Sequence, residues 1–328
     1  MAGHRIAFAL QHEAHVTLVD PKDYFEIPMA VPRLLVEPSR TPEALLPYAE
    51  FLPAVEHVRD RVVSVQPGLV RLSSGVAIPY DNLVLATGCA YPTDVLKAVE
   101  GGLDARRVHF EDLAARLRAA RRILIVGGGP VGVEIAGEIA QDLPGREVRL
   151  IQRGKYLIPS LAPGPSKYAR DHLRKHGVEV VFGRDVADSD IATADLVLWC
   201  AGYGLDTSYL RDYPGKVLDE FGRVLVDPYL RMTGTENVFV AGDITALPEP
   251  KLGIWAGRHA AVIIENLRNP RKLKAYKPAT GNKTMLVTLG RRHGTGHAPF
   301  GDFTNSWLAR KFKATDMFIG KYRKAVGL

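Results

Sequence analysis

"RRILIVGGGPVGVEIAGEIAQDLPGREVRLIQRG", residues 121–154, is the stretch that decides the fold. An apolar run at 123–126 predicts a buried strand, and glycines follow at positions 127, 129 and 132. The residues through about 141 have the spacing of an amphipathic helix, and the run at 148–152 predicts a second strand. This order of strand, G-x-G-x-x-G turn, helix and strand is typical of a dinucleotide-binding α/β unit.

The three glycines of this turn each meet a physical requirement. Gly127 permits the tight turn, Gly129 lets the backbone approach a pyrophosphate, and Gly132 lets the helix pack close to the strand. The phosphates would lie at the helix N-terminus, where free N–H groups and the helix dipole favour anions. The alternative interpretation is a glycine-rich turn that binds no ligand.

The residue that usually contacts the adenosine ribose favours NADPH over NADH. An acid is common about 20 positions after the third glycine, where it bonds the ribose 2′-hydroxyl of NAD. Here that position is Gln152, and Arg153 and Lys155 follow it. No carboxylate repels a 2′-phosphate, and two cations could receive one. The alternative is a solvated loop whose charges have no role in binding.

Three further segments frame this unit. "YDNLVLATG" at 80–88 and "ADLVLWCAGY" at 194–203 each predict an apolar strand that ends in a turn of small residues. "NVFVAGD" at 237–243 predicts a strand that ends in Gly-Asp, and a helical pattern follows it. The order of these segments around the central glycine-rich turn is more informative than any one of them.

Composition limits the classes of protein that fit. With 328 residues, of which 46% are hydrophobic, the chain can bury two or three cores. Its two cysteines, Cys89 and Cys200, form no C-x-x-C, which argues against a disulfide scaffold, a structural zinc site and a dithiol redox centre. We therefore expect an intracellular protein without a metal site. No apolar run reaches the length of about 18 residues that a membrane span needs, and no signal-peptide core is present.

The positive charge is concentrated in the last 48 residues. Residues 281–328 contain nine basic and two acidic side chains, which accounts for the whole formal net charge of +7. Aromatic residues alternate with these cations, so the segment suits a peripheral contact with an anionic membrane. Two alternatives remain: nucleic-acid binding, which is the least favoured, and a folded cap with a solvated cationic face.

The whole arrangement resembles the two-dinucleotide-binding-domain flavoprotein reductases, and most closely the apoptosis-inducing-factor-like, ferroptosis-suppressing quinone reductases. "VTLVDPKDYFE" at 16–26, "LVLATG", "GGGPVGVEIAGEI", "VFVAGD" and "VTLGRRHGTG" at 287–296 carry the likeness. The resemblance implies an α/β fold of two Rossmann-like domains, with the NAD(P) domain inserted in the FAD domain. We expect an FAD-binding part at 1–105, the NAD(P) domain at 106–213, a second FAD-binding part at 214–280 and the basic segment at 281–328.

The first residues match only the second half of a nucleotide-binding unit. Gly3 occupies the place of the third glycine of the FAD turn, and Asp20, 17 residues later, that of the ribose-binding acid. The first strand and two glycines of that turn have no counterpart, which we interpret as an N-terminal truncation. A chain that cannot hold FAD would be a non-catalytic NADPH-binding protein.

The resemblance implies a set of FAD contacts. Asp20 would bind the adenosine ribose, Arg33 the phosphates, and a backbone group near Val62 the adenine. Thr87 and Gly88 would line the turn near the cofactor, and Asp243 would bond the ribityl chain. Each acid or cation also has a structural alternative: a turn residue for Asp20, a surface cation for Arg33 and a helix N-cap for Asp243.

Two residues are candidates for the reaction itself. In the family, the glutamate of "GVE", here Glu134, faces the contact between nicotinamide and flavin. Lys251 follows the Asp243 motif and could stabilise negative charge on the reduced flavin. Trp255, near Lys251, could stack on the flavin or belong to the core. Cys89 is interpreted as structural.

The sequence thus predicts an FAD-dependent NAD(P)H:quinone oxidoreductase. Hydride would pass from NADPH, or NADH, to FAD, and the two electrons would then reduce a quinone of the lipid type. A reductase for an iron–sulfur or haem partner is the enzymatic alternative. We expect the protein in the cytoplasm or peripherally on an organelle membrane.

Overall fold

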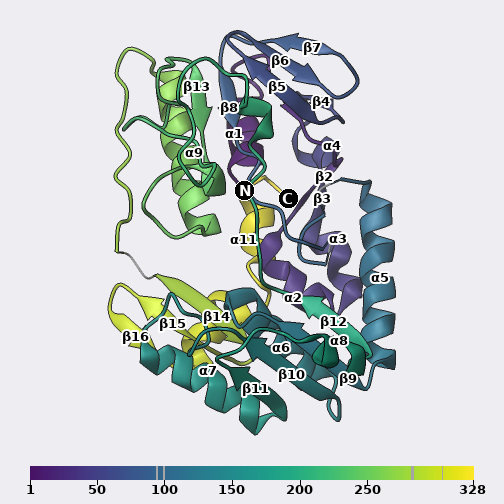
Figure 1. Cartoon of the computed structure of the whole chain (residues 1–328). Coiled ribbons are helices and arrows are strands. Elements are labelled where there is room, and N and C mark those ends of the chain that lie inside the picture. The colour runs from purple at the N-terminus through teal and green to yellow at the C-terminus, as the bar shows by residue number, and fades with distance from the viewer. Residues whose placement is uncertain (94, 99, 282–283, 305) are drawn as a thin grey trace.

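The computed structural model describes residues 1–93, 95–98, 100–281, 284–304 and 306–328. The glycine-rich stretch lies in a four-stranded parallel sheet of order β11–β10–β9–β12, seen at the bottom of Figure 1. Its strands are β9 (Arg122–Val126), β10 (Glu147–Gln152), β11 (Val178–Phe182) and β12 (Leu196–Trp199). The associated helices are α5 (Leu103–Ala119), α6 (Pro130–Asp142), α7 (Pro163–Lys175) and α8 (Asp188–Thr193). The predicted strand–turn–helix–strand unit is confirmed, and each boundary lies within one residue of its expected place.

Segments before and after this sheet pair with each other. β8 (Leu83–Leu85) and β13 (Val238–Val240) form a parallel pair, although the whole four-stranded sheet lies between them in sequence. A second parallel pair joins β1 (Thr17–Val19) to β4 (Glu56–Val58). The helices α1 (Ala2–Leu10) and α9 (Gly253–Arg268) pack together beside them. One domain is therefore inserted into another, as expected; the exact domain limits stay predictions.

Smaller elements complete this upper half. An antiparallel sheet contains β5 (Val62–Gln66), β6 (Leu69–Leu72) and β7 (Ala77–Pro79). The hairpin of β2 (Tyr24–Glu26) and β3 (Leu45–Pro47) encloses four short helices: η1 (Pro28–Ala30), α2 (Val31–Leu34), η2 (Pro38–Arg40) and α3 (Thr41–Ala44). Three short helices lie elsewhere: α4 (Tyr48–Phe51), η3 (Ser208–Leu210) and η4 (Gly242–Ile244).

The basic segment folds against the lower domain. Its antiparallel sheet consists of β14 (Met285–Leu289), β15 (His293–Ala298) and β16 (Gly301–Phe303), and its helices are α10 (Ser306–Ala309), the π-helix η5 (Arg310–Ala314) and α11 (Ile319–Lys324). β14 approaches α6 so closely that a Cβ on Gly137 would lie 2.8 Å from the backbone nitrogen of Gly290. Figure 1 shows β14–β16 beside α7, while α11 reaches up between the two halves.

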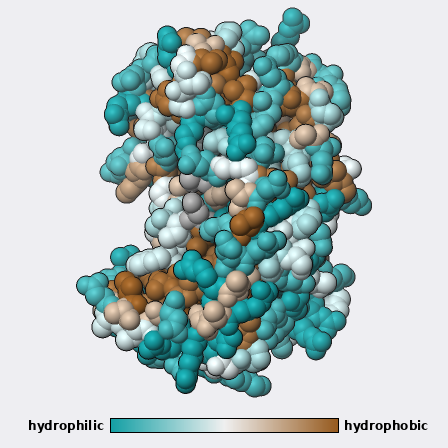
Figure 2. Space-filling view, turned by 90° about the vertical axis from the view of Figure 1, so that its right-hand side faces the viewer, coloured by the Kyte–Doolittle hydropathy of each residue, from teal (hydrophilic) through white to brown (hydrophobic). Residues whose placement is uncertain are grey.

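The surface around α5 is predominantly hydrophilic. Figure 2 views that side, and polar residues cover most of its middle. Within the described part of the chain, no helix combines the length and apolarity that crossing a bilayer requires.

Candidate functional site

In the turn between β9 and α6, two of the three motif glycines have no room for a side chain, whereas the third adjoins free space. A Cβ on Gly132 would lie 2.0 Å from the carbonyl oxygen of Gly127, so only glycine allows this approach of helix and strand. Gly127 has a φ of 109° and lies against Ala201. Over Gly129, no atom of the described residues lies within 4 Å of a hypothetical Cβ, apart from the glycine's own chain neighbours. The open space adjoins the N-terminus of α6, so the turn fits the pyrophosphate of a dinucleotide.

Two polar side chains lie at the end of β10, where the adenosine of the dinucleotide is expected. One is an amide and the other is an exposed cation. Gln152 accepts a hydrogen bond from the backbone N–H of Gly128 at 2.9 Å, so its side chain supports the glycine turn. Arg153 is exposed, and its Nε lies 4.0 Å from the carboxylate of Asp185. A pair at that distance leaves most guanidinium donors available to a phosphate.

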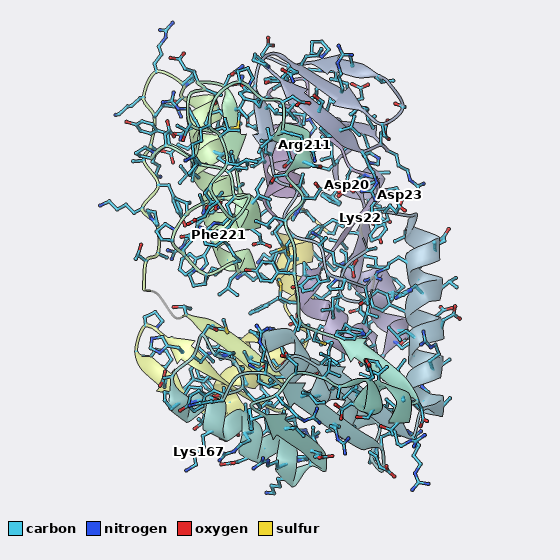
Figure 3. The ribbon with its side chains drawn as sticks, viewed as in Figure 1. Asp20, Lys22, Asp23, Lys167, Arg211 and Phe221 are labelled. Atoms are coloured by element: carbon cyan, nitrogen blue, oxygen red, sulfur yellow. The ribbon has the colours of Figure 1, made fainter. Side chains whose placement is uncertain are left out.

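On the upper half, the predicted FAD-binding acids Asp20 and Asp243 follow the carboxyl ends of the parallel strands β1 and β13. Asp20 follows β1, where its carboxylate accepts hydrogen bonds from the backbone N–H of Lys22 and from the hydroxyl of Tyr48, both at 2.8 Å. Burial and the charge of Asp20 raise the pKa of Tyr48 well above its usual value, so this hydroxyl stays a donor. Figure 3 shows Asp20, Lys22 and Asp23 grouped at this edge. Asp20 keeps lone pairs for a ribose, which fits FAD.

A lysine that sequence reasoning missed, Lys97, lies near both of these acids. The Nζ of Lys97 donates to the carbonyl oxygen of Cys89 at 2.5 Å and lies 3.3 Å from a hypothetical Cβ on Gly88. Burial lowers its pKa, while the carboxylates of Asp243 and Asp20 oppose that change. Both predicted FAD-binding acids therefore act on one ammonium group. Lys97 lies in an irregular segment without periodicity, so no sequence signal singles it out.

Other predicted FAD contacts have partners of their own. The hydroxyl of Thr87 shares a 3.0 Å hydrogen bond with that of Tyr209, and a Cβ on Gly3 would lie 3.4 Å from the Cβ of Ala86. Val62 begins β5 beside a register shift of the antiparallel sheet. The roles proposed for these three residues stay predictions.

Cys89 has the environment of a structural thiol. Burial, with the nearby carboxylate of Asp243, raises its pKa to about 11, and burial alone raises that of Cys200 to about 12. Both cysteines are free, and such thiols remain protonated and weakly nucleophilic near neutral pH.

Arg33 does not occupy the place that the resemblance implies. Its side chain is fully buried and donates to both carboxylate oxygens of Glu138, at 2.6 and 2.9 Å. It also donates to the carbonyl oxygen of Ala314 at 2.9 Å. The predicted contact with cofactor phosphates is wrong, as is the surface-cation alternative. A guanidinium enclosed by protein and bound on two sides has no access to a ligand.

Glu134 is buried and bound by the basic segment. Its Oε1 accepts a hydrogen bond from the backbone N–H of Thr288 at 2.9 Å and lies 2.5 Å from the Nζ of Lys313. Its predicted role beside the nicotinamide stays a prediction. Lys313 and Thr288 were missed because nothing in the sequence separates this lysine from the other cations of the segment.

Lys251 lies two residues before α9, and Trp255 lies in the first turn of that helix. The Nζ of Lys251 donates to the carbonyl oxygen of Thr245 at 2.6 Å, and burial lowers its pKa although Asp243 opposes the change. Trp255 is only 2% exposed, and the guanidinium of Arg258 lies 4.7 Å from its ring. Its indole N–H is buried without a hydrogen-bond partner among the described residues. Trp255 belongs to the core, and its donor is compatible with a ligand at the start of α9.

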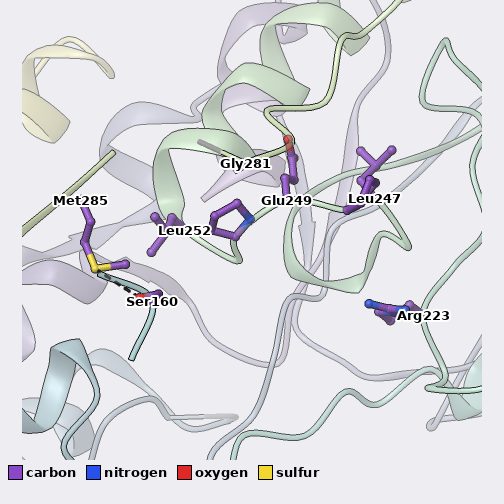
Figure 4. A pocket seen from close by; sticks show the side chains of 9 residues that line it. Ser160, Arg223, Leu247, Glu249, Leu252, Gly281 and Met285 are labelled. Atoms are coloured by element: carbon purple, nitrogen blue, oxygen red, sulfur yellow. Dashed lines mark hydrogen bonds between the residues drawn. The ribbon is translucent and has the colours of Figure 1, made fainter. Parts of the chain in front are cut away.

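A cavity of about 340 Å³ lies where the second FAD-binding part, the lower domain and the basic segment meet. Figure 4 shows Ser160 and Met285 on one side of this cavity and Arg223 on the other. Its walls are Ser160, Arg223, Leu247, Pro248, Glu249, Pro250, Leu252, Gly281 and Met285. Apolar side chains predominate, with one cation, one buried acid and one hydroxyl, a lining typical of sites for small organic molecules.

The chain has relatives along almost its whole length. The sequence profile described as pyridine nucleotide-disulphide oxidoreductase matches residues 1–264. Ferroptosis suppressor protein 1 of Xenopus tropicalis is 30% identical over 342 residues, which cover 94% of this chain and 89% of that protein. The Homo sapiens protein of the same name is 29% identical, with 92% and 87% covered. Apoptosis-inducing factor homolog A of Dictyostelium discoideum is 23% identical, with 98% and 88% covered.

Solved structures share the fold. The sulfide:quinone oxidoreductase of Aquifex aeolicus superposes with a TM-score of 0.79 at 17% identity and covers 99% of this chain and 89% of that one. NDH2 of Plasmodium falciparum in complex with NADH gives a TM-score of 0.75 at 14% identity, with 98% and 95% covered.

Proposed function

The chain belongs to the pyridine nucleotide-disulphide oxidoreductase family, and from that membership we propose that it reduces a quinone-type acceptor. The resemblance to ferroptosis-suppressing and apoptosis-inducing-factor-like reductases is confirmed. The protein is an NAD(P)H-dependent flavin oxidoreductase that uses FAD. Its acceptor is the part that we propose.

One observation carries the choice of acceptor. Family members that reduce disulfides need a pair of reactive cysteines, whereas this chain has two cysteines at positions 89 and 200, and burial raises the pKa of both thiols. FAD, held by the strand-end residues of the upper half, would supply the transfer of two electrons from NAD(P)H directly to an external molecule. A flat, apolar quinone meets that requirement and matches the apolar walls of the cavity in Figure 4.

The protein's own residues bind, orient and exclude water. The turn at Gly129 and the N-terminus of α6 receive the dinucleotide phosphates. Asp20 and Asp243 hold ribose and ribityl hydroxyls at the strand ends. The Glu134–Lys313 pair fixes the basic segment against α6, beside the place where the nicotinamide ring is expected. Lys251 supplies positive charge at the start of α9.

Steady-state kinetics with two kinds of acceptor test this function. We expect the FAD-loaded protein to oxidise NADPH rapidly with a short-chain ubiquinone analogue and at least tenfold more slowly with ferredoxin or cytochrome c. A preference for the redox protein would replace the quinone proposal by the iron–sulfur or haem alternative. A colourless protein that binds NADPH without oxidising it would support the non-catalytic alternative.

We also propose that the outer face of the basic segment contacts an anionic membrane. Phe300, Trp307 and Phe312 are 72%, 58% and 54% exposed, and the ammonium group of Lys311 lies near the two latter rings. Met317 and Ile319 of the same segment are buried, so part of the segment is a folded cap. Aromatic rings beside cations are favoured at the interface of a charged bilayer.

Flotation with vesicles tests this contact. Wild-type protein should float with vesicles containing phosphatidylserine, and the Trp307→Ala/Phe312→Ala variant should lose most of that binding. Phe221→Ala is the matched control, because Phe221 is 68% exposed outside the basic segment. Equal flotation of all three proteins would contradict the membrane contact.

A further inference from the structure

We propose that Glu249 and His259 form a positioning pair that holds the turn bearing Asp243 and, through the charge of Glu249, sets the reduction potential of bound FAD. Neither residue was a sequence candidate. Both are buried, with side chains 1% and 2% exposed, and they come from the cavity-lining loop and from α9.

The imidazole links a backbone donor to a carboxylate. The Nδ1 of His259 accepts a hydrogen bond from the N–H of Gly242 at 3.0 Å, so this nitrogen carries no proton. The proton therefore resides on Nε2, which donates to the Oε1 of Glu249 at 2.6 Å. Burial lowers the pKa of His259 despite the opposing charge of Glu249, which keeps the ring neutral near pH 7.

The side chain of Glu249 accepts hydrogen bonds from three neutral groups. Besides the imidazole, it accepts hydrogen bonds from the hydroxyl of Tyr276 at 2.8 Å and from the backbone N–H of Ala279 at 2.9 Å. Three donors therefore converge on one buried carboxyl group, and both of its oxygens act as acceptors. Within the described ranges, no arginine or lysine donates a hydrogen bond to this carboxylate. Lys251 interacts with it only through charge, since Glu249 opposes the lowering of the pKa of Lys251 by burial.

The turn that the pair holds is the one expected to bind FAD. Gly242 has a φ of 80°, a conformation that favours glycine, and it begins η4 directly before Asp243. Its carbonyl oxygen is already held by the hydroxyl of Thr245 at 3.0 Å, whereas its N–H depends on His259. Removing the imidazole would leave one side of the turn without its hydrogen bond. The direction of the Asp243 side chain would then no longer be fixed.

The charge has an effect that hydrogen bonding alone would not produce. Reduction of a flavin adds negative charge, and a buried carboxylate linked to the flavin-binding turn by one imidazole opposes it. Neutralising Glu249 should therefore make bound FAD easier to reduce. A purely structural role would change FAD affinity or folding without a directed change in potential.

Three variants test the proposal with readouts that do not depend on turnover. Glu249→Gln should keep FAD bound within about threefold of wild-type affinity and shift the reduction potential, measured by xanthine oxidase titration, to a more positive value. His259→Leu should weaken FAD binding at least tenfold in flavin fluorescence. Glu265→Gln is the matched control. Glu265 is an exposed acid on α9, the helix of His259, and its carboxylate lies 2.6 Å from the Nζ of Lys274.

The possible results distinguish the electrostatic role of Glu249 from the positioning role of His259. A positive shift for Glu249→Gln, with Glu265→Gln unchanged, supports the proposal even if His259→Leu fails to fold. An unchanged or more negative potential for Glu249→Gln overturns the electrostatic role, and wild-type FAD affinity in a folded His259→Leu variant overturns the positioning role. Neither result bears on which acceptor the enzyme uses.

Discussion

Arg33 donates two hydrogen bonds to Glu138, 105 residues away, with both side chains completely buried. One turn earlier on the same face of α6, Glu134 receives Lys313 from the basic segment. The helix that begins at the dinucleotide turn thus carries two buried carboxylates, each bound by a cation from another segment. These two ion pairs fix the NAD(P) domain against the FAD-binding part and the basic segment.

Breaking the first pair should destabilise the protein strongly. Arg33→Met leaves the carboxylate of Glu138 buried without its cation, which typically costs about 3–5 kcal/mol of unfolding free energy. Arg33→Met/Glu138→Met removes both charges and should recover much of that loss, because well-packed apolar pairs often replace buried ion pairs without penalty. Urea unfolding monitored by tryptophan fluorescence measures both. A double variant less stable than the single one would show that the pair contributes more than charge compensation.

The glycine turn offers a pair of substitutions with opposite consequences. Gly129→Ala has open space for its methyl group, so the fold should keep its stability while the Kd for NADPH rises at least tenfold. Gly132→Ala places its methyl group against the carbonyl oxygen of Gly127 and should lower the melting temperature by several degrees. Calorimetry and NADPH titration on both proteins separate the effects. Similar NADPH affinity in Gly129→Ala and wild type would contradict a pyrophosphate at this turn.

Local sequence patterns predicted the architecture well. The glycine spacing at 127, 129 and 132 fixes a backbone geometry that few other residues allow, so the strand–turn–helix unit followed from sequence alone. The insertion of one domain into another followed from the resemblance, and the pairing of β8 with β13 confirms it. Patterns of this kind are local. They predict structure reliably because the backbone geometry of the turn requires those residue types.

Contacts between distant segments were not predictable in the same way. Arg33 looked like a surface or phosphate-binding cation, because no local pattern announces a partner 105 residues away. Lys313, Lys97 and the Glu249–His259 pair were missed for the same reason. A buried charged residue can be identified only when its partner is known. The periodicity of a single sequence carries no information about such partners.

Arg153 should determine the preference between the two nicotinamide cofactors. It is the exposed cation directly after Gln152, at the end of β10 where the adenosine ribose is expected. Arg153→Ala should raise the KM for NADPH about tenfold and leave that for NADH within twofold, because only the former carries a 2′-phosphate. Lys167→Ala, on α7 at the lower edge of Figure 3, is the control and should change neither value. An equal rise for both cofactors would assign Arg153 to general nucleotide binding.

Acidification should destabilise the protein through a cluster of three histidines, one on α7, one directly after it and one on β15. The ring of His172 lies 4.2 Å from that of His176 and 4.7 Å from that of His293. Burial, followed by the charges of these neighbours and of Lys175, lowers the pKa of His172 to about 4. In the unfolded chain the imidazole takes up its proton near pH 6.5, so this group favours unfolding progressively as the pH falls from about 6.5 to 4.

His172→Gln should therefore have a shallower decline of melting temperature between pH 7 and 4.5 than wild type. His12→Gln is the control, since His12 is exposed on the other half of the molecule. Parallel melting curves for His172→Gln and wild type across this range would show that His172 does not titrate with a lowered pKa in the native state.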